Sequence, residues 1–288
     1  MTPAVMKVNM ITFINWLMEP LKYEFMLRGM IAAILVGIVC AVVGTYIVLR
    51  GMAFFGDALA HTILPGIAIG YLITGGARDT LFWWALGTAV IAALGIGAIS
   101  KQTKIKEDTA IGIIFAGMFA LGIALISTVR SYAVDLSHFL FGDVLGVSTQ
   151  SLGLIIIFGA IILFTIAAFY KEFLTISFDP ILAATLRLPV NLLNNLLLVL
   201  IAVTVAVSLQ TVGVALMVAM LVTPAATAYL LTQRLPVMMA LAAFFAGLAG
   251  VAGLYLSYYL SIASGAAIVL TATTFFLAAF LWKQAKSI

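Results

Sequence analysis

The chain has 288 residues, of which 65% are hydrophobic and only 8% are charged, and its mean hydropathy is +1.27. Soluble globular proteins carry about 25% charged residues and about 45–50% apolar ones. This composition excludes a soluble enzyme, because the charged side chains are too few to cover a water-facing surface of this size. The formal net charge of +4 is too small and too dispersed for a nucleic-acid partner. We therefore predict an all-α polytopic membrane protein whose surface contacts the lipid bilayer.

Residues 1–24 precede the first long apolar segment. Lys7 is followed by an interrupted apolar run that ends in charged residues, and no small-residue cleavage site follows. A secretory signal peptide is therefore not expected. We expect this N-terminal segment to lie in the membrane interface, with Trp16 and Tyr23 at the level of the lipid headgroups.

Apolar segments long enough to cross a bilayer then follow one another along the chain. A transmembrane helix needs about 20 apolar residues. Two of the segments meet at Gln210 and Thr211 with almost no loop, so we expect eight or nine transmembrane helices in a single domain over residues 1–288. The segments are residues 25–49, 56–74, 81–100, 109–128, 152–170, 192–209, 212–231, 237–260 and 266–282.

Asp57 and His61 in the second segment are four residues apart, which places both on one face of a helix. Ionisable residues at membrane depth are costly and usually functional, and a carboxylate with an imidazole can bind a divalent transition metal ion. Pro65 also removes the backbone hydrogen bond to the carbonyl of His61. Two ligands are too few for one ion, but a homodimer with its two-fold axis along the pore would supply four. The alternative is that Asp57 caps a helix and contacts His61 structurally.

A second polar cluster lies in the connection after the fourth segment. It contains Asp135, Asp143 and His138, which is the only other histidine of the chain. This loop could receive a metal ion or a partner protein. The alternative is that its polar residues only interact with water, because exposed polar side chains need no special explanation.

The connection after the fifth segment is predicted to form a short cytoplasmic helix over residues 177–189. Ser177 or Asp179 can cap its start, Pro180 fits its first turn, and Pro189 ends it. Its apolar residues, among them Leu182, would be presented to a docking partner. The alternative is a helix packed against the membrane face.

Basic residues indicate the orientation of the bundle. They cluster after the third, fifth, seventh and last segments, which all lie on one side if there are nine spans. The positive-inside rule assigns that side to the cytoplasm, so we expect a cytoplasmic C-terminus and an N-terminus outside. The basic residues are Lys101, Lys104, Lys106, Lys171, Arg187, Arg234, Lys283 and Lys286.

The chain resembles the manganese/zinc/iron permeases of ABC importers from Leu49 to about Phe280. Several independent blocks occur in the same order, which makes the resemblance specific. In those permeases a glycine usually precedes the Leu-Pro pair, where this chain has Arg187. The best-matching blocks are residues 50–66, 107–113, 135–146, 177–189, 212–216, 223–226 and 256–260.

The resemblance implies a homodimeric transport subunit, itself not an enzyme, in a bacterial cell membrane. Its partners would be two cytoplasmic ATPase subunits and a metal-binding solute receptor on the outer face. The implied metal ligands are Asp57 and His61. The implied ATPase-coupling residues are Ser177, Phe178, Asp179, Pro180 and Leu182, and the implied receptor-facing residues are Asp135, His138 and Asp143.

The transported ion would be Mn(II), Zn(II) or Fe(II), and no permanently bound cofactor is expected. An Asp and His set without cysteine suits manganese as well as zinc or iron. Residues 135–142 and 19–21 look more like those of the manganese members of the family, so the resemblance favours Mn(II), with Zn(II) close behind. No Gly-x-x-x-x-Gly-Lys-Ser/Thr motif occurs, so ATP hydrolysis is expected in a separate subunit. The competing prediction is a stand-alone secondary transporter, for which inverted repeats would be typical.

Overall fold

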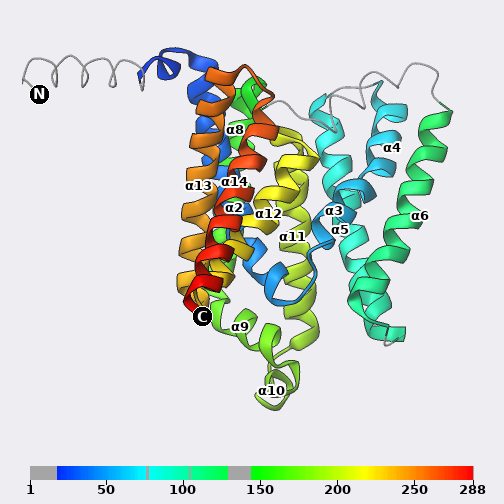
Figure 1. The fold of residues 1–288 in the computed structure, drawn as a ribbon. Helices are drawn as coiled ribbons and strands as arrows, with labels where there is room; N and C mark the ends of the chain where they lie inside the picture. Colours follow the sequence, from blue (N-terminus) through cyan, green and yellow to red (C-terminus); the bar gives the residue numbers. More distant parts are fainter. Residues whose placement is uncertain (1–17, 76–77, 104, 129–143, 288) are drawn as a thin grey trace, which may run out of the picture.

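The computed structural model describes residues 18–75, 78–103, 105–128 and 144–287 (Figure 1). Within these ranges the regular structure is helical, and nine segments are long and apolar enough to cross a membrane. The prediction of an all-α membrane protein with eight or nine spans is therefore confirmed, and nine spans are found among the residues that the structure describes. The elements are η1 (Pro20–Lys22), α2 (Glu24–Leu49), α3 (Phe55–Thr62), α4 (Leu64–Thr74), α5 (Arg78–Thr103), α6 (Glu107–Ser127), η2 (Val144–Gly146), α8 (Thr149–Ala168), α9 (Tyr170–Phe178), α10 (Pro180–Thr185), α11 (Val190–Val212), α12 (Val214–Leu231), α13 (Leu235–Leu260) and α14 (Ser264–Ser287).

Gly213 separates the two spans whose boundary was uncertain in the sequence. Helix α11 ends at Val212 and α12 begins at Val214, so one residue joins them. Gly213 has φ of 78° and ψ of 170°, a backbone conformation that a side chain would strongly disfavour. A single glycine therefore redirects the chain here, which explains why no loop is visible in the sequence.

The second span is interrupted at Ile63. Helix α3 ends at Thr62, and α4 begins at Leu64 with Pro65 in its first turn. Because proline has no backbone N–H, it cannot donate to the carbonyl of His61. The span therefore consists of two consecutive helices, and His61 lies in the last turn of the first one.

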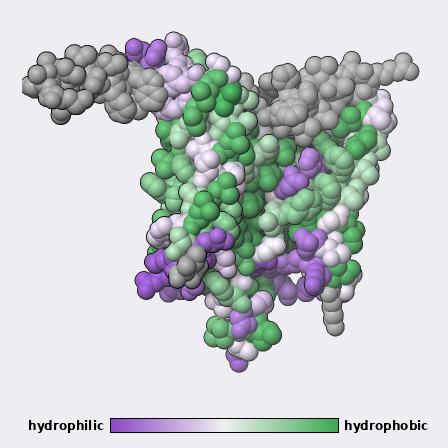
Figure 2. Space-filling model, in the orientation of Figure 1, coloured by the Kyte–Doolittle hydropathy of each residue, from purple (hydrophilic) through white to green (hydrophobic). Residues whose placement is uncertain are grey.

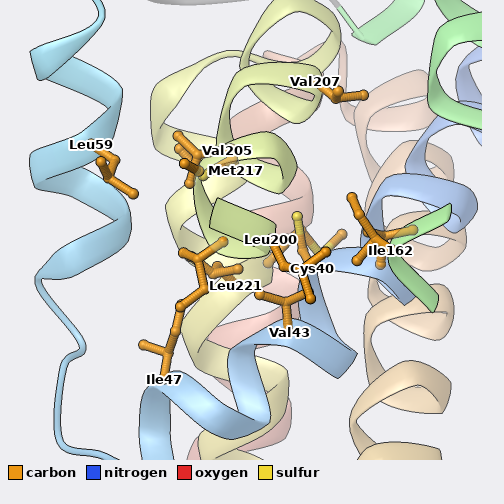
Figure 3. Packing of buried hydrophobic residues seen from close by; sticks show 14 of the residues in the cluster. Cys40, Val43, Ile47, Leu59, Ile162, Leu200, Val205, Val207, Met217 and Leu221 are labelled. Atoms are coloured by element: carbon orange, nitrogen blue, oxygen red, sulfur yellow. The ribbon is translucent and has the colours of Figure 1, made fainter. Parts of the chain in front are cut away.

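Two groups of helices are visible in Figure 1. On one side α2 packs against α12 and α13, while on the other α4 packs against α5 and α6. Helix α3 lies between the groups and contacts α5, α6, α11 and α12. In Figure 3, Leu59 extends from α3 toward Val205 of α11 and Met217 of α12, and all three are fully buried. This packing holds one face of α3 against the core.

The predicted helix over residues 177–189 differs in the structure. Ser177 belongs to the last turn of α9, and a separate helix, α10, covers only Pro180–Thr185. Arg187 has φ of 57°, in the left-handed region, so the helix ends at Thr185, four residues before Pro189. Helices α9 and α10 project beyond the membrane-spanning helices at the end of the bundle where α14 also ends (Figure 1). We call residues 170–186, which include those predicted to contact an ATPase, the coupling segment.

Candidate metal site and coupling segment

Asp57 lies in the first turn of α3 without capping it. The N-cap is Phe54, and no side-chain hydrogen bond caps this end of the helix. The backbone N–H of Phe55 instead donates to Met52 O at 2.9 Å, and that of Ala58 donates to Phe54 O at 3.0 Å. The alternative interpretation of Asp57 as a helix cap is therefore wrong.

The side chains of Asp57 and His61 face each other along α3. His61 Nε2 lies 3.8 Å from Asp57 Oδ1, and the two side chains are 26% and 34% exposed, respectively. This separation is too long for a hydrogen bond. It is within the span of about 4.2 Å that two ligands of one ion can have when each bond is about 2.0–2.1 Å long. Both side chains are partly exposed.

Two phenylalanines of α6 fix the ring of His61. Its centroid lies 5.9 Å from that of Phe115 and 5.5 Å from that of Phe119, both in edge-to-face geometry. The two phenylalanine rings stack on each other at 5.7 Å, and Phe54 packs edge-on against Phe115. We call Phe54, Phe115 and Phe119 the aromatic clamp. It restricts the rotation of His61 and leaves Nε2 directed at Asp57.

The opposite face of α3 is held very close to α12. A Cβ atom on Gly56 would lie 2.4 Å from Leu221 Cδ2, so only glycine fits here without a shift of its neighbour. Asp57 and His61 are therefore held between a tightly packed core and the aromatic clamp. In Figure 2 a hydrophilic patch interrupts the hydrophobic surface at the level of α3, about midway along the bundle.

One copy of the chain supplies an incomplete ligand set. In the part of the chain that the structure describes, no group of three or more His, Cys, Asp or Glu side chains could hold a metal ion. Zinc sites usually have four ligands, and manganese favours octahedral sites made of oxygen ligands. Two side chains thus provide half or less of a coordination sphere, as the sequence indicated.

The coupling segment presents apolar side chains to the outside. Asp179 is the N-cap of α10, where its Oδ1 accepts hydrogen bonds from the backbone N–H groups of Ile181 at 3.0 Å and Leu182 at 2.9 Å. Pro180 occupies the first turn. The exposed apolar side chains are Phe178, Ile181, Leu182 and Leu186. Ser177 differs from them, because its hydroxyl accepts a hydrogen bond from Arg50 Nε at 3.3 Å.

Asp135, His138 and Asp143 lie outside the described residues, so their receptor-facing role stays a prediction.

The sequence interpretation missed the clamp residues Phe115 and Phe119, although their four-residue spacing places them on one face of a helix.

Comparison with known proteins assigns the chain to a family. The sequence profile of the ABC 3 transport family matches residues 22–283. The chain belongs to this family. The resemblance to ABC importer permeases is thereby confirmed, and the fold is that of a membrane component of an ABC transporter.

The chain is similar to several relatives over nearly the whole length of each. The "Manganese transport system membrane protein MntC" of Halalkalibacterium halodurans is 47% identical over 268 residues, which are 93% of this chain and 90% of the relative. A "Probable iron transport system membrane protein" of Haemophilus influenzae is 38% identical and covers 94% of this chain and 98% of its own. The solved structure "PsaBC from Streptococcus pneumoniae in complex with Fab" is 41% identical, with a TM-score of 0.79 over 93% of this chain and 95% of that one.

Proposed function

We propose that this chain is the membrane-spanning subunit of an ATP-driven importer of Mn(II). The observation that carries this proposal is the Asp57–His61 pair, which lies within the first seven residues of the chain's second span, with 3.8 Å between His61 Nε2 and Asp57 Oδ1. A carboxylate and an imidazole without a thiolate suit manganese, and zinc or iron would also bind. Relatives named as manganese transport proteins support Mn(II) as the cargo.

A second copy of the chain would complete the ligand set. Two copies related by a two-fold axis along the pathway bring two aspartates and two histidines around one ion. Helix α6, which carries Phe115 and Phe119 beside the pair, is the least buried of the nine spans found among the described residues. Its exposed side faces lipid in a monomer and is free to pack against a partner in a dimer.

Two cytoplasmic ATPase subunits would dock on the coupling segment of the two copies. Ile181 is 79% exposed beside Phe178, Leu182 and Leu186, and such a group of apolar side chains at the end of a membrane bundle is typical of a protein interface. The basic connections lie at the same end, which supports a cytoplasmic C-terminus in the bacterial cell membrane. A metal-binding receptor would then dock on the opposite, outer face, near Asp135, His138 and Asp143.

Uptake by the complete complex tests this function. Proteoliposomes that contain the chain, its ATPase and its receptor should accumulate Mn(II) only with ATP, and Zn(II) and Fe(II) should be compared in the same assay. Asp57→Asn and His61→Ala should each abolish uptake, because the first removes the negative charge of the carboxylate and the second removes the nitrogen ligand. Asp108→Asn is the matched control, since it removes a carboxylate at an exposed position in the first turn of α6. Uptake without ATP would favour a secondary transporter, and normal uptake by both site variants would refute the site.

A further inference from the structure

Arg50 joins three elements at the end of the bundle where the coupling segment lies. It is the C-cap residue of α2. Its Nε donates a hydrogen bond to Ser177 Oγ of α9 at 3.3 Å, and its Nη1 donates to Asn194 Oδ1 of α11. The planar guanidinium group holds its donors in a fixed fork, so both partners are positioned relative to one another.

The charge of Arg50 is partly removed from water. Burial lowers the pKa of its guanidinium group, while the negative charge of Glu107 opposes that shift. Glu107 is the first residue of α6, the helix that carries Phe115 and Phe119. An arginine remains charged in proteins, so Arg50 is a half-buried cation that donates hydrogen bonds to two side-chain oxygens.

A short and well-ordered turn connects Arg50 to the metal-binding pair. Gly51, with φ of 70°, reverses the chain, and the backbone N–H of buried Met52 donates to Ile47 O at 3.0 Å. Helix α3 starts at Phe55, and Asp57 follows in its first turn. Because this turn is hydrogen-bonded at both ends, a displacement of Arg50 would move the start of α3.

A second contact joins α2 to the coupling segment one helical turn earlier. The ring of Tyr46 packs edge-on against Phe173 of α9, with centroids 5.9 Å apart, and both side chains are fully buried. Helix α9 is therefore attached to the end of α2 by one aromatic contact and one charged hydrogen bond.

We propose that Arg50 is a positioning residue that transmits movement of the coupling segment to α3 and so sets the geometry of Asp57 and His61. This inference rests on the proposed function in one respect, namely that the ATPase acts on the coupling segment. If Arg50 had a purely structural role, its substitution would impair folding or assembly of the complex, and not the transmission of movement to α3.

Arg50→Lys separates these roles, because lysine keeps the charge but cannot hold Ser177 and Asn194 in one rigid fork. In the complete complex we expect normal binding of the ATPase subunits and ATP hydrolysis within about two-fold of wild type. The amount of Mn(II) carried per ATP should fall about tenfold or more, the size expected for losing a hydrogen bond to a charged group. Arg234→Lys, at the exposed α12–α13 turn, is the matched control and should change none of these values.

A labelling experiment tests the same inference without reference to the cargo. Ala53 is exposed in the turn between Arg50 and α3, and the native Cys40 is fully buried. The maleimide labelling rate of Ala53→Cys should change when ATP binds to the complex, and Arg50→Lys should abolish that change. Ser177→Ala, which removes only the acceptor on α9, should weaken it in the same direction. This second variant decides the question if Arg50→Lys fails to fold.

An unchanged ratio of Mn(II) to ATP together with an unchanged ATP-dependent labelling rate would overturn the inference. Loss of ATPase binding by Arg50→Lys or Ser177→Ala would also overturn it, because Arg50 would then shape the docking surface rather than transmit movement. If the wild-type complex carries no metal, the proposed function fails, and the labelling rates alone still decide the role of Arg50.

Discussion

The two ring nitrogens of His61 have different surroundings. Nε2 faces the Asp57 carboxylate at 3.8 Å, whereas Nδ1 is buried and has no hydrogen-bond partner in the described part of the chain. Leaving a buried polar atom unpaired costs about 1–3 kcal/mol, so the histidine is held where a hydrogen bond or an ion would stabilise it. In a neutral histidine, binding of an ion at one nitrogen leaves the proton on the other. The clamp orientation therefore favours metal binding through Nε2.

The aromatic clamp gives a prediction about affinity. Phe119→Ala removes one edge-to-face partner of His61, an interaction of about 0.5–1.5 kcal/mol, and leaves the ring free to turn away from Asp57. The Mn(II) concentration for half-maximal uptake should rise about two- to tenfold, because the ligand is no longer held in position. Phe164→Ala on α8 is the control, since that side chain is 76% exposed and should not affect affinity. An unchanged half-maximal concentration for Phe119→Ala would mean that the clamp does not orient the ligand.

Arg187 gives a prediction about stability. It stands where the family pattern has glycine, and its φ of 57° lies in the left-handed region that glycine adopts without steric cost. Arg187→Gly should stabilise the purified chain by up to about 1 kcal/mol, measured by thermal unfolding in detergent. Arg234→Gly is the comparison, because Arg234 has φ of −95° and gains nothing from glycine. Equal or lower stability of Arg187→Gly would show that no strain is relieved.

The sequence correctly predicted contacts between residues that are neighbours along one helix. The four-residue spacing of Asp57 and His61 predicted that they face each other, and they do. The sequence did not indicate Arg50 or the clamp. Their contacts join residues far apart in the chain, such as Arg50 with Ser177 and Asn194, and helical periodicity contains no information about such pairs.

At the scale of the helices, apolar length predicted each membrane span to within a few residues. Hydropathy changes sharply at the ends of a span, which makes membrane helices easier to locate than soluble ones. The prediction failed for the helix over residues 177–189, because backbone conformation rather than hydropathy decides its bounds. Asp179 is extended and caps α10, and the left-handed Arg187 ends it. Pro189 instead precedes the first residue of α11.

The cap of α10 gives a prediction about docking. Asp179→Ala removes the acceptor of two backbone N–H groups and should cost about 1 kcal/mol of local helix stability. The exposed apolar side chains of α10 would then be poorly arranged, and binding of the ATPase subunits, measured by co-purification, should weaken. Asp179→Ser should restore binding, because serine also caps helices without carrying a charge. Failure of serine to restore it would mean that the carboxylate itself contacts the ATPase.

At the scale of the whole molecule, the spans found among the described residues place the coupling segment and the end of α14 at one end of the bundle and the start of α2 at the other (Figure 1). Asp57 and His61 lie between these ends on α3, which contacts helices of both groups. Movement of the groups relative to each other would therefore change access to the pair. Composition and segment count predicted the membrane architecture, and Pro65 indicated a missing backbone hydrogen bond in the second span, whereas the position of α3 between the helix groups depends on packing.

The proposed pairing of two copies around one ion gives the last prediction. When wild-type chain and Asp57→Asn are produced in equal amounts, random pairing leaves about one quarter of the dimers with two intact copies. If one ion needs ligands from both copies, Mn(II) uptake per total permease should fall to about one quarter, whereas independent sites would leave about one half. Mixing with Asp108→Asn should leave uptake unchanged. Uptake near one half in the Asp57→Asn mixture would mean that each copy binds and carries its own ion, and that the remaining ligands come from the same chain.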